Sequence, residues 1–250
     1  MKRIALFLIV SILSFSGHEI MAGCDSINLH FHERIPYVHE IENGVEGFTA
    51  TPATAAFQKA DIPFQWKKTP SKRQMLIIKN NKGCDCAVGW FKNPEREKFA
   101  KYTLPIYQDR PQIALTRADN EKLRSGMTVD SLFSDPNLIL GVKNGYSYGI
   151  YLDMKIVQHK PAVEKTTCEN INMLKLIHVR RWDYFFIAPE EADWLIESSG
   201  LSKKDFKYIE FKDIPEGEKR YIMCSQKVGD EIIERLNKAI TEEDFLKSKK

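Results

Sequence analysis

The sequence predicts an α/β protein built from two similar units, and three observations support this prediction. Segments in which apolar and polar residues alternate, or in which apolar residues form a short run, are typical of strands. They alternate along the chain with segments whose apolar residues have the spacing of a helix. This order is typical of a parallel sheet covered by helices. The order starts again near residue 128, as if a second unit began there. The chain is also long enough for two lobes of about 100 residues each.

The expected elements of the first unit are strands at 29–32, 64–66 and 84–88 and helices at 52–60, 71–80 and 94–101. Pro52 suits a first helical turn. Ser71 is expected to cap its helix and Gly83 to end it. The expected elements of the second unit are helices at 128–133, 146–154, 170–178 and 190–197 and strands at 138–142 and 184–187. A strand at 221–224 and an amphipathic helix at 230–240 are expected to follow.

The N-terminus has the pattern of a secretory signal peptide over residues 1–22. Lys2 and Arg3 precede an apolar run at 5–13, and Ala22 offers a cleavage site, with an earlier alternative at 14–16. The run is far shorter than the roughly 20 residues of a membrane-spanning helix, and no later segment replaces it. We therefore expect a soluble protein exported to the periplasm.

The five cysteines leave one thiol unpaired in an oxidising compartment. One alternative takes residues 21–24 as an imperfect lipobox, in which Cys24 is acylated and tethers the protein to a membrane. The polar residues 16–19 favour simple cleavage over this alternative. The sequence leaves the pairing of the cysteines open.

The charge of the chain argues against nucleic acid as a partner. The formal net charge is only +3, and the basic residues are dispersed except at the C-terminus. His30 and His32 lie on one face of a strand, as do Cys84 and Cys86, so a metal site is conceivable. Nothing indicates that the two pairs meet, and we expect neither a metal nor a cofactor.

Several motifs, taken in order, resemble one family. They are 35–37 (Ile-Pro-Tyr), 47–48 (Gly-Phe), 82–85 (Lys-Gly-Cys-Asp), 89–96 (Gly-Trp-Phe-Lys-Asn-Pro-Glu-Arg), 105–107 (Pro-Ile-Tyr), 140–145 and 181–184. In this order the chain resembles the bacterial extracellular solute-binding proteins of family 3, whose best-known members bind polar amino acids for ABC importers. The resemblance extends over nearly the whole chain after the signal peptide.

The resemblance implies a two-lobed type II periplasmic binding protein fold with the ligand cleft between the lobes. Lobe I would comprise 23–112 and 213–250, and lobe II would be the inserted segment 113–212. Two crossover strands, expected at 112–118 and 212–220, would act as the hinge. The family also implies a monomer that delivers its ligand to a membrane permease.

The resemblance assigns the ligand's carboxylate to Arg96, because a guanidinium offers a rigid fork for two oxygens. On residue type alone, a surface arginine paired with Glu95 or Glu97 is the better interpretation, and only the context of the motif favours binding. Asn93 replaces the family's threonine, and Gly89 opens the motif. Ser147 is the expected anchor in lobe II, at the start of a helix whose N–H groups favour an anion; an ordinary helix cap is the alternative.

Aromatic side chains are expected to form the walls of the cleft, namely Trp90, Tyr37 and Tyr146. A place in the core is the alternative for each of the three, and the cleft is favoured for Trp90 because it follows a strand end, where ligands of α/β sheets gather. Arg73 lies near the helix start that carries an aromatic wall in amino-acid binders, so it contacts either the ligand or water.

One departure from the family bears on the ligand. Amino-acid binders have an acidic residue five positions after the aspartate that corresponds to Asp183, and here that position is Ala188. We therefore expect a small polar or carboxylate-bearing solute, not necessarily an α-amino acid. The main hypothesis is a solute receptor of an ABC importer without catalytic activity. A sensory or partner-docking protein is the alternative, and a dehydratase-like enzyme on the same fold is a weaker one.

Overall fold

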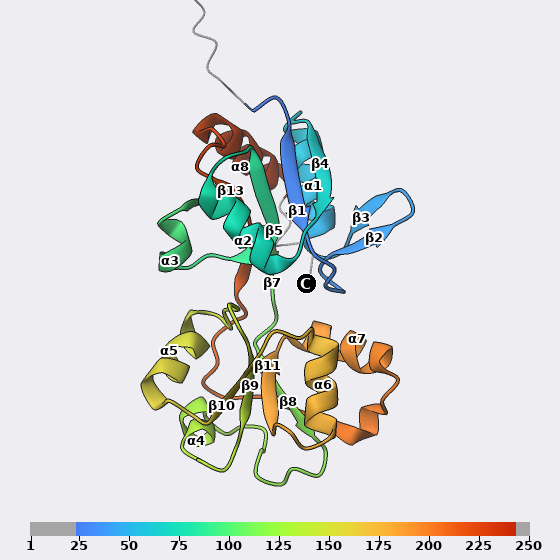
Figure 1. Cartoon of the computed structure of the whole chain (residues 1–250), viewed down its shortest axis with the longest axis vertical. Coiled ribbons are helices and arrows are strands. Elements are labelled where there is room, and N and C mark those ends of the chain that lie inside the picture. Colours follow the sequence, from blue (N-terminus) through green and yellow to red (C-terminus); the bar gives the residue numbers. More distant parts are fainter. Residues whose placement is uncertain (1–23, 244–250) are drawn as a thin grey trace, which may run out of the picture.

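The computed structural model describes residues 24–243 and shows two α/β lobes joined by two chain segments (Figure 1). The predicted mixed α/β fold is confirmed. The predicted signal peptide lies outside the described residues. Within 24–243, none of the helices has both the length and the apolar character that crossing a membrane requires.

The first lobe contains a mixed sheet with the order β4-β1-β5-β13-β6. Its strands are β1 (Ile27–Phe31), β4 (Phe64–Lys68), β5 (Asp85–Phe91), β6 (Ala100–Tyr102) and β13 (Lys219–Ser225), and β7 (Tyr107–Gln108) pairs with β13. Strands β4, β1 and β5 are parallel, and β13 runs antiparallel to β5. The helices α1 (Ala50–Lys59), α2 (Ser71–Asn80) and α8 (Asp230–Glu243) flank this sheet.

Alternation along β5 and β13 explains why helices cover both faces of this sheet. Val88 and Ile222 belong to the core formed with α1 and α8. Ala87 and Met223, one residue away on each strand, belong instead to the cluster that contains Ile78 of α2. Successive side chains of a strand point to opposite faces. The amphipathic helix predicted at the C-terminus is thus the element that closes one face of the sheet.

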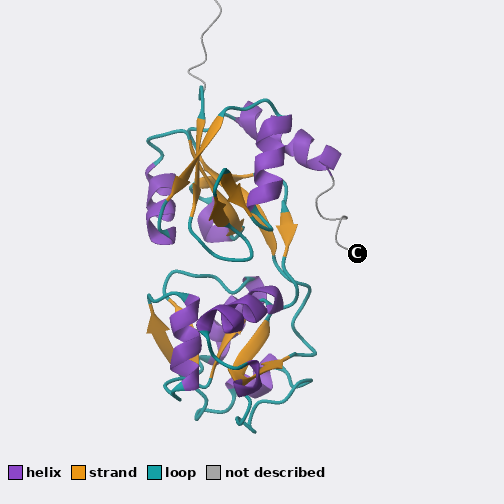
Figure 2. Ribbon diagram, turned by 90° about the vertical axis from the view of Figure 1, so that its right-hand side faces the viewer, coloured by secondary structure: helices purple, strands orange, loops and turns teal. Residues whose placement is uncertain are grey.

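The second lobe contains a sheet with the order β10-β9-β11-β8-β12. Its strands are β8 (Ile113–Arg117), β9 (Leu140–Lys143), β10 (Val163–Thr166), β11 (Tyr184–Ile187) and β12 (Phe206–Ile209). Helices α6 (Asn170–His178) and α7 (Pro189–Ser199) pack on one face. Helices α4 (Val129–Phe133) and α5 (Ile150–His159) pack on the other, and Figure 2 shows helices on both sides of each sheet.

The chain crosses between the lobes in two places: the first crossing differs from the expected hinge strand 112–118, and the second overlaps the expected segment 212–220. Residues 113–117 form β8, which pairs with β11 and β12 inside the second sheet, so the first crossing lies before this strand. The return crossing lies between β12 and β13, because β13 already begins at Lys219 in the first sheet. The error arose because an extended segment in the sequence does not reveal which sheet it joins.

Two helices differ from their predicted bounds by four residues or more. Helix α3 (Pro94–Glu97) is shorter than expected, because Ala100–Tyr102 joins the first sheet as β6. Helix α5 begins at Ile150 and not at residue 146. Ser71 is the first residue of α2 and not its cap. The chain also forms a small hairpin, β2 (His39–Ile41) with β3 (Gly44–Glu46), and a 3-10 turn, η1 (Lys203–Asp205).

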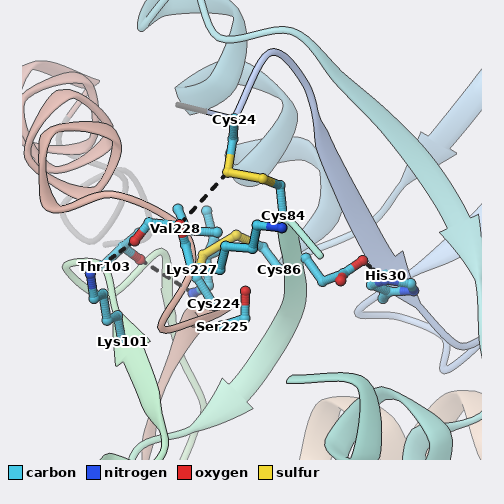
Figure 3. The surroundings of a disulfide bond; sticks show 12 residues. Cys24, His30, Cys84, Cys86, Lys101, Thr103, Cys224, Ser225, Lys227 and Val228 are labelled. Carbon is cyan, nitrogen blue, oxygen red and sulfur yellow. Dashed lines mark hydrogen bonds and ion pairs between the residues drawn. A yellow bond between two sulfur atoms is a disulfide. The ribbon is translucent and has the colours of Figure 1, made fainter. Parts of the chain in front are cut away.

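Two disulfides lie in the first lobe (Figure 3). Cys24 pairs with Cys84, and Cys86 of β5 pairs with Cys224 of β13. Cys168 is the unpaired fifth cysteine. A Cys24 that is joined to Cys84 has no free thiol to acylate, so the structure disfavours the lipobox alternative.

Candidate functional site

A cavity lies between the two lobes, at the carboxyl ends of β1, β5 and β9. It encloses about 370 Å³ of empty space, including the part open to solvent. Its lining residues from the first lobe are His32, Arg34, Val88, Gly89, Trp90, Phe91, Arg96 and Arg220, and those from the second lobe are Tyr146 and Ser147. Ligands of open α/β sheets gather beyond the carboxyl ends of strands, so this cavity is the candidate binding site.

Arg96 is a buried cation of this cavity, with only 8% of its surface exposed. Asn93 caps α3 by accepting a hydrogen bond from the Arg96 backbone N–H at 3.0 Å. One guanidinium nitrogen donates to the Phe91 carbonyl at 2.8 Å, and the guanidinium lies 4.9 Å from the centre of the Trp90 ring. No carboxylate within residues 24–243 pairs with Arg96, and burial lowers its pKa.

Gly89 brings backbone to the wall of the cavity. Its φ of +80° is in the left-handed region, where residues with a side chain are strained. A Cβ at this position would also lie 3.0 Å from the hydroxyl of Thr49. The Gly89 carbonyl accepts a hydrogen bond from Arg220 at 3.0 Å. Gly89 therefore permits the close approach of β5 to Thr49 at the start of α1.

Ser147 lines the cavity but does not start a helix, which corrects the expected anion site. Its hydroxyl donates to Asp153 at 2.5 Å, and the Tyr148 N–H donates to the other Asp153 oxygen at 2.8 Å. The first N–H of α5, on Ile150, donates to Glu218 at 2.8 Å. The protein's own carboxylates thus hold the donors that the sequence interpretation had offered to a ligand.

Tyr37 and Arg73 are not brought into this cavity. Tyr37 is 2% exposed and packs in the first lobe, with Arg220 3.9 Å from the centre of its ring. Arg73 is exposed on α2. The neighbouring residue Gln74 is the side chain of α2 that reaches the site, through a hydrogen bond from the Trp90 indole. Gln74 reaches the site and Arg73 does not, because consecutive residues of a helix point in different directions.

Five lining residues were not among the predicted site residues: the apolar Val88 and Phe91, and the polar His32, Arg34 and Arg220. Arg34 forms a two-fold hydrogen-bonded ion pair with Glu191 of α7 at 2.8 and 2.6 Å. Arg220 forms a similar pair with Asp109 at 2.6 and 2.7 Å. The positions of His32 and Arg34 just after a parallel strand could have indicated them. Arg220 had no such signal, because its place depends on how the distant strand β13 joins the sheet.

His32 connects the two lobes across the cavity. One ring nitrogen lies 3.1 Å from the Tyr146 hydroxyl, and the other lies 3.3 Å from the Gln74 amide nitrogen. Burial, with the nearby cations Arg34 and Lys143, lowers the pKa of His32 from 6.5 to about 3. The imidazole is therefore neutral at physiological pH.

The histidines and cysteines of the metal alternative do not meet. His30 contacts Thr69 and Asp85, each at 2.9 Å, whereas His32 contacts Tyr146. The four paired cysteines are held in disulfides. In the described part of the chain, no group of three histidine, cysteine or acidic side chains has a metal-binding arrangement.

A comparison of the sequence with known protein families identifies the family of this chain. The model of the bacterial extracellular solute-binding proteins, family 3, matches residues 31–244. The chain belongs to this family. No curated protein matches this family 3 protein in sequence.

Solved structures show the same fold at low sequence identity. An ancestral arginine-binding protein bound to arginine is 17% identical, with a TM-score of 0.69 over 88% of this chain and 92% of that chain. A structure from a study of glutathione import in Streptococcus mutans is 14% identical, with a TM-score of 0.70 over 89% and 91%. Holo ArgBP from T. maritima is 16% identical, with a TM-score of 0.67 over 87% and 90%. The family 3 protein therefore has the two-lobed fold of type II binding proteins.

Proposed function

We propose that this family 3 protein captures a small anionic solute, with a carboxylate as its preferred group, in the cavity between its lobes. The observation that carries this proposal is the buried guanidinium of Arg96, which lacks a carboxylate partner within the described residues. A buried cation that no carboxylate contacts is costly. A ligand carboxylate that accepts from its free N–H groups would offset this cost through a charge-assisted, two-fold contact.

The remaining charges of the cavity favour the same choice of ligand. Three guanidinium groups and no carboxylate are among its lining residues. Arg34 and Arg220 are already paired with Glu191 and Asp109, which leaves Arg96 for the ligand. The walls formed by Val88, Trp90 and Phe91 suit a short apolar body attached to the anionic group.

A ligand ammonium finds no prepared partner in this cavity. Ala188, which occupies the position of the family's acidic residue, is 1% exposed and packs in a buried cluster with Phe31 and Tyr37. Glu191, one turn further along α7, is held by Arg34 and by Asn170 at 2.7 Å. We therefore infer that the solute carries an anionic group but needs no amine.

We also propose that the protein works in the periplasm, without catalysing a reaction, and delivers its solute to the permease of an ABC importer. The family and the two disulfides, which persist in oxidising compartments, support this proposal. Solved relatives are described as bound to arginine or glutamine and as parts of amino-acid importers. The proposed lobes are 23–112 with 213–250, and 113–212, moving about the two crossings as a monomer.

A thermal-shift panel of small carboxylates, amino acids and amines tests the proposed function. A ligand that binds only the folded protein raises the melting temperature, by the equivalent of about 2.7 kcal/mol at a concentration of 100 times Kd. Carboxylates without an amine should give shifts at least as large as the matching amino acids. Amines alone should give none. A panel in which only amines stabilise the protein would refute the proposal.

Arg96→Ala should weaken binding of every carboxylate hit by about 100-fold or more, because it removes both the charge and the fork-shaped donor. Calorimetric titration measures this change. Arg73→Ala is the matched control, since Arg73 is an exposed arginine outside the cavity. Equal affinities of the Arg96→Ala and Arg73→Ala variants would show that Arg96 is not the anchor.

A further inference from the structure

A chain of hydrogen bonds runs from Trp90 through Gln74 and His32 to Tyr146 along the wall of the cavity. We propose that this chain turns the hydroxyl proton of Tyr146 toward the solute, so that Tyr146 is a second donor to the anion held by Arg96 and His32 is its positioning residue. The role of the solute in this inference rests on the proposed function. The order of donors and acceptors in the chain does not.

The direction of the chain is set at Gln74. An indole N–H can only donate, so the Gln74 side-chain oxygen, 2.9 Å from the Trp90 nitrogen, must accept. The Gln74 amide nitrogen then donates to the Thr69 carbonyl at 2.7 Å and to His32 Nδ1 at 3.3 Å. Gln74 has no exposed surface, so water does not compete for these contacts. The buried amide therefore has one orientation.

This orientation decides which nitrogen of His32 carries the proton. Nδ1 accepts from Gln74, so in the neutral ring the proton is on Nε2. Nε2 lies 3.1 Å from the Tyr146 oxygen and donates to it. Because that oxygen accepts, the hydroxyl proton of Tyr146 is not used in this contact. Tyr146 is a lining residue of the cavity, so its proton is available to an anion there.

Cations flank the Tyr146 ring and strengthen its hydroxyl as a donor. The Arg34 guanidinium lies 5.5 Å from the centre of the ring, and the Lys143 ammonium lies 4.6 Å from it. Both positive charges draw electron density from the phenol and attract an anion to the same place. Tyr146 and Arg96 line the same small cavity from opposite lobes, which suits two donors that grip one carboxylate.

The chain crosses from one lobe to the other between His32 and Tyr146. Its last link therefore exists only when the lobes are together, and opening them removes the cover that the second lobe gives to His32. The charged groups that face His32 are Arg34, Lys143 and Arg220, which disfavour its protonation, and Glu191, which favours it. Burial and these cations lower the pKa of His32 to about 3, whereas an exposed imidazole keeps its ordinary value of 6.5.

This difference between the lobe positions gives binding a pH dependence. Below pH 6.5 the open protein binds a proton on His32 that the closed protein must lose, so acidification favours the open form. The affinity for a carboxylate should therefore fall by up to about tenfold per pH unit as the pH decreases below 6.5.

Nitrogen-15 NMR of the histidine rings in the ligand-free protein tests the chain without any solute. His32→Gln identifies the signals of His32, and His39→Gln is the control for a partly exposed histidine that pairs with Glu46. The expected result is a neutral His32 with the proton on Nε2 at about pH 8, where the ring is neutral whether the lobes are open or closed. A proton on Nδ1 at this pH would overturn the proposal.

Acetate, with neutral acetamide as its control, tests the donor role of Tyr146. Tyr146→Phe should weaken acetate binding by about 10- to 100-fold, the range for a hydrogen bond to a charged group, and should change acetamide binding much less. Tyr208→Phe, which loses a hydroxyl bonded to Asp193 on the second lobe, should bind acetate like the wild type. Unchanged acetate affinity in Tyr146→Phe would overturn the proposal.

The pH profile of acetate affinity completes the test. His32→Gln should bind acetate with little change between about pH 8 and about pH 5, whereas the wild type should weaken over the acidic half of this range. Profiles of equal slope would contradict the role of His32. A wild-type protein that fails to bind acetate, yet carries the His32 proton on Nε2, would refute the carboxylate site of the proposed function and support the hydrogen-bond chain.

Discussion

Asp153 shows at the level of single residues how this site differs from the sequence interpretation. A carboxylate does accept hydrogen bonds from the Ser147 hydroxyl and from the backbone N–H of the neighbouring residue Tyr148, but this carboxylate belongs to the protein. Burial raises the pKa of Asp153, and its contacts with Ser147, Tyr148 and the Arg96 charge oppose that increase. Asp153 thus accepts the hydrogen bonds that the second lobe was expected to donate to a ligand. Arg96 is therefore left as the main candidate anchor.

Replacing Asp153 should change stability and binding in opposite directions. Asp153→Ala removes the side chain that satisfies the backbone before α5, and it should lower the free energy of unfolding by about 1 kcal/mol. The same change releases donors beside the cavity and removes a negative charge near Arg96, so acetate should bind about three- to tenfold more tightly. Denaturant unfolding and calorimetric titration measure the two effects. Weaker acetate binding in this variant would mean that Asp153 supports the ligand site and does not compete with the ligand.

The start of α5 shows, at the level of elements, why a helix was misplaced. Residues 146–149 have the composition of a first helical turn, but Gly149 has a φ of +96° and ends the loop there. A Cβ on Gly149 would overlap the carboxylate of Glu218, which accepts from the first N–H of the helix. The helix therefore begins at Ile150, because Glu218, more than 60 positions away in the sequence, accepts the hydrogen bond of its first N–H.

Gly149→Ala should therefore lower the free energy of unfolding by more than the backbone strain at this position alone would. Alanine in the left-handed region costs about 1–2 kcal/mol, and displacement of Glu218 adds to this cost. Gly126→Ala is the matched control, because Gly126 has a φ of +85° and a Cβ at that position would meet no atom within 4 Å. Thermal or denaturant unfolding should show a larger loss for Gly149→Ala. Equal losses would mean that Glu218 moves freely and does not fix the start of α5.

The contact between Arg34 and Glu191 is the clearest link between the lobes at the scale of the whole molecule. It joins the loop after β1 to α7, and Asn170 adds a third hydrogen bond to the same carboxylate. Burial alone would raise the pKa of Glu191, but the Arg34 guanidinium outweighs it and holds this pKa below the ordinary 4.5. The link is therefore intact above about pH 4.5 and weakens as the pH falls further.

Glu191→Gln should favour the open arrangement of the lobes. It leaves Arg34 without its opposite charge, and Arg34 is partly exposed, so the loss should be about 1–3 kcal/mol and smaller than for a deeply buried pair. Small-angle X-ray scattering should show a larger radius of gyration in the ligand-free variant. Glu164→Gln, which breaks an exposed pair with Arg181 inside the second lobe, is the control. A radius of gyration that stays at the wild-type value would show that this pair does not hold the lobes together.

Local sequence signals predicted much of the fold. The apolar periodicity of residues 170–178 and the run at 184–187 predicted α6 and β11 with their observed bounds. The motif at 89–96 predicted Gly89, Trp90 and Arg96 as neighbours in one site, and all three line the cavity. Such signals are readable because a strand, a helix or a short motif is specified by residues close together in the chain.

The sequence by itself determined the α/β class, the family and the motif that carries the candidate anchor. Only the tertiary structure decided that Tyr37 belongs to the core, that Asp153 fills the second lobe's anion site, and that His32 meets Tyr146. The physical reason is distance along the chain: His32 and Tyr146 are 114 positions apart, and Arg220 and Asp109 are 111 apart. Pairings of this kind depend on how strands order in a sheet and how two lobes face each other, and no local pattern records either.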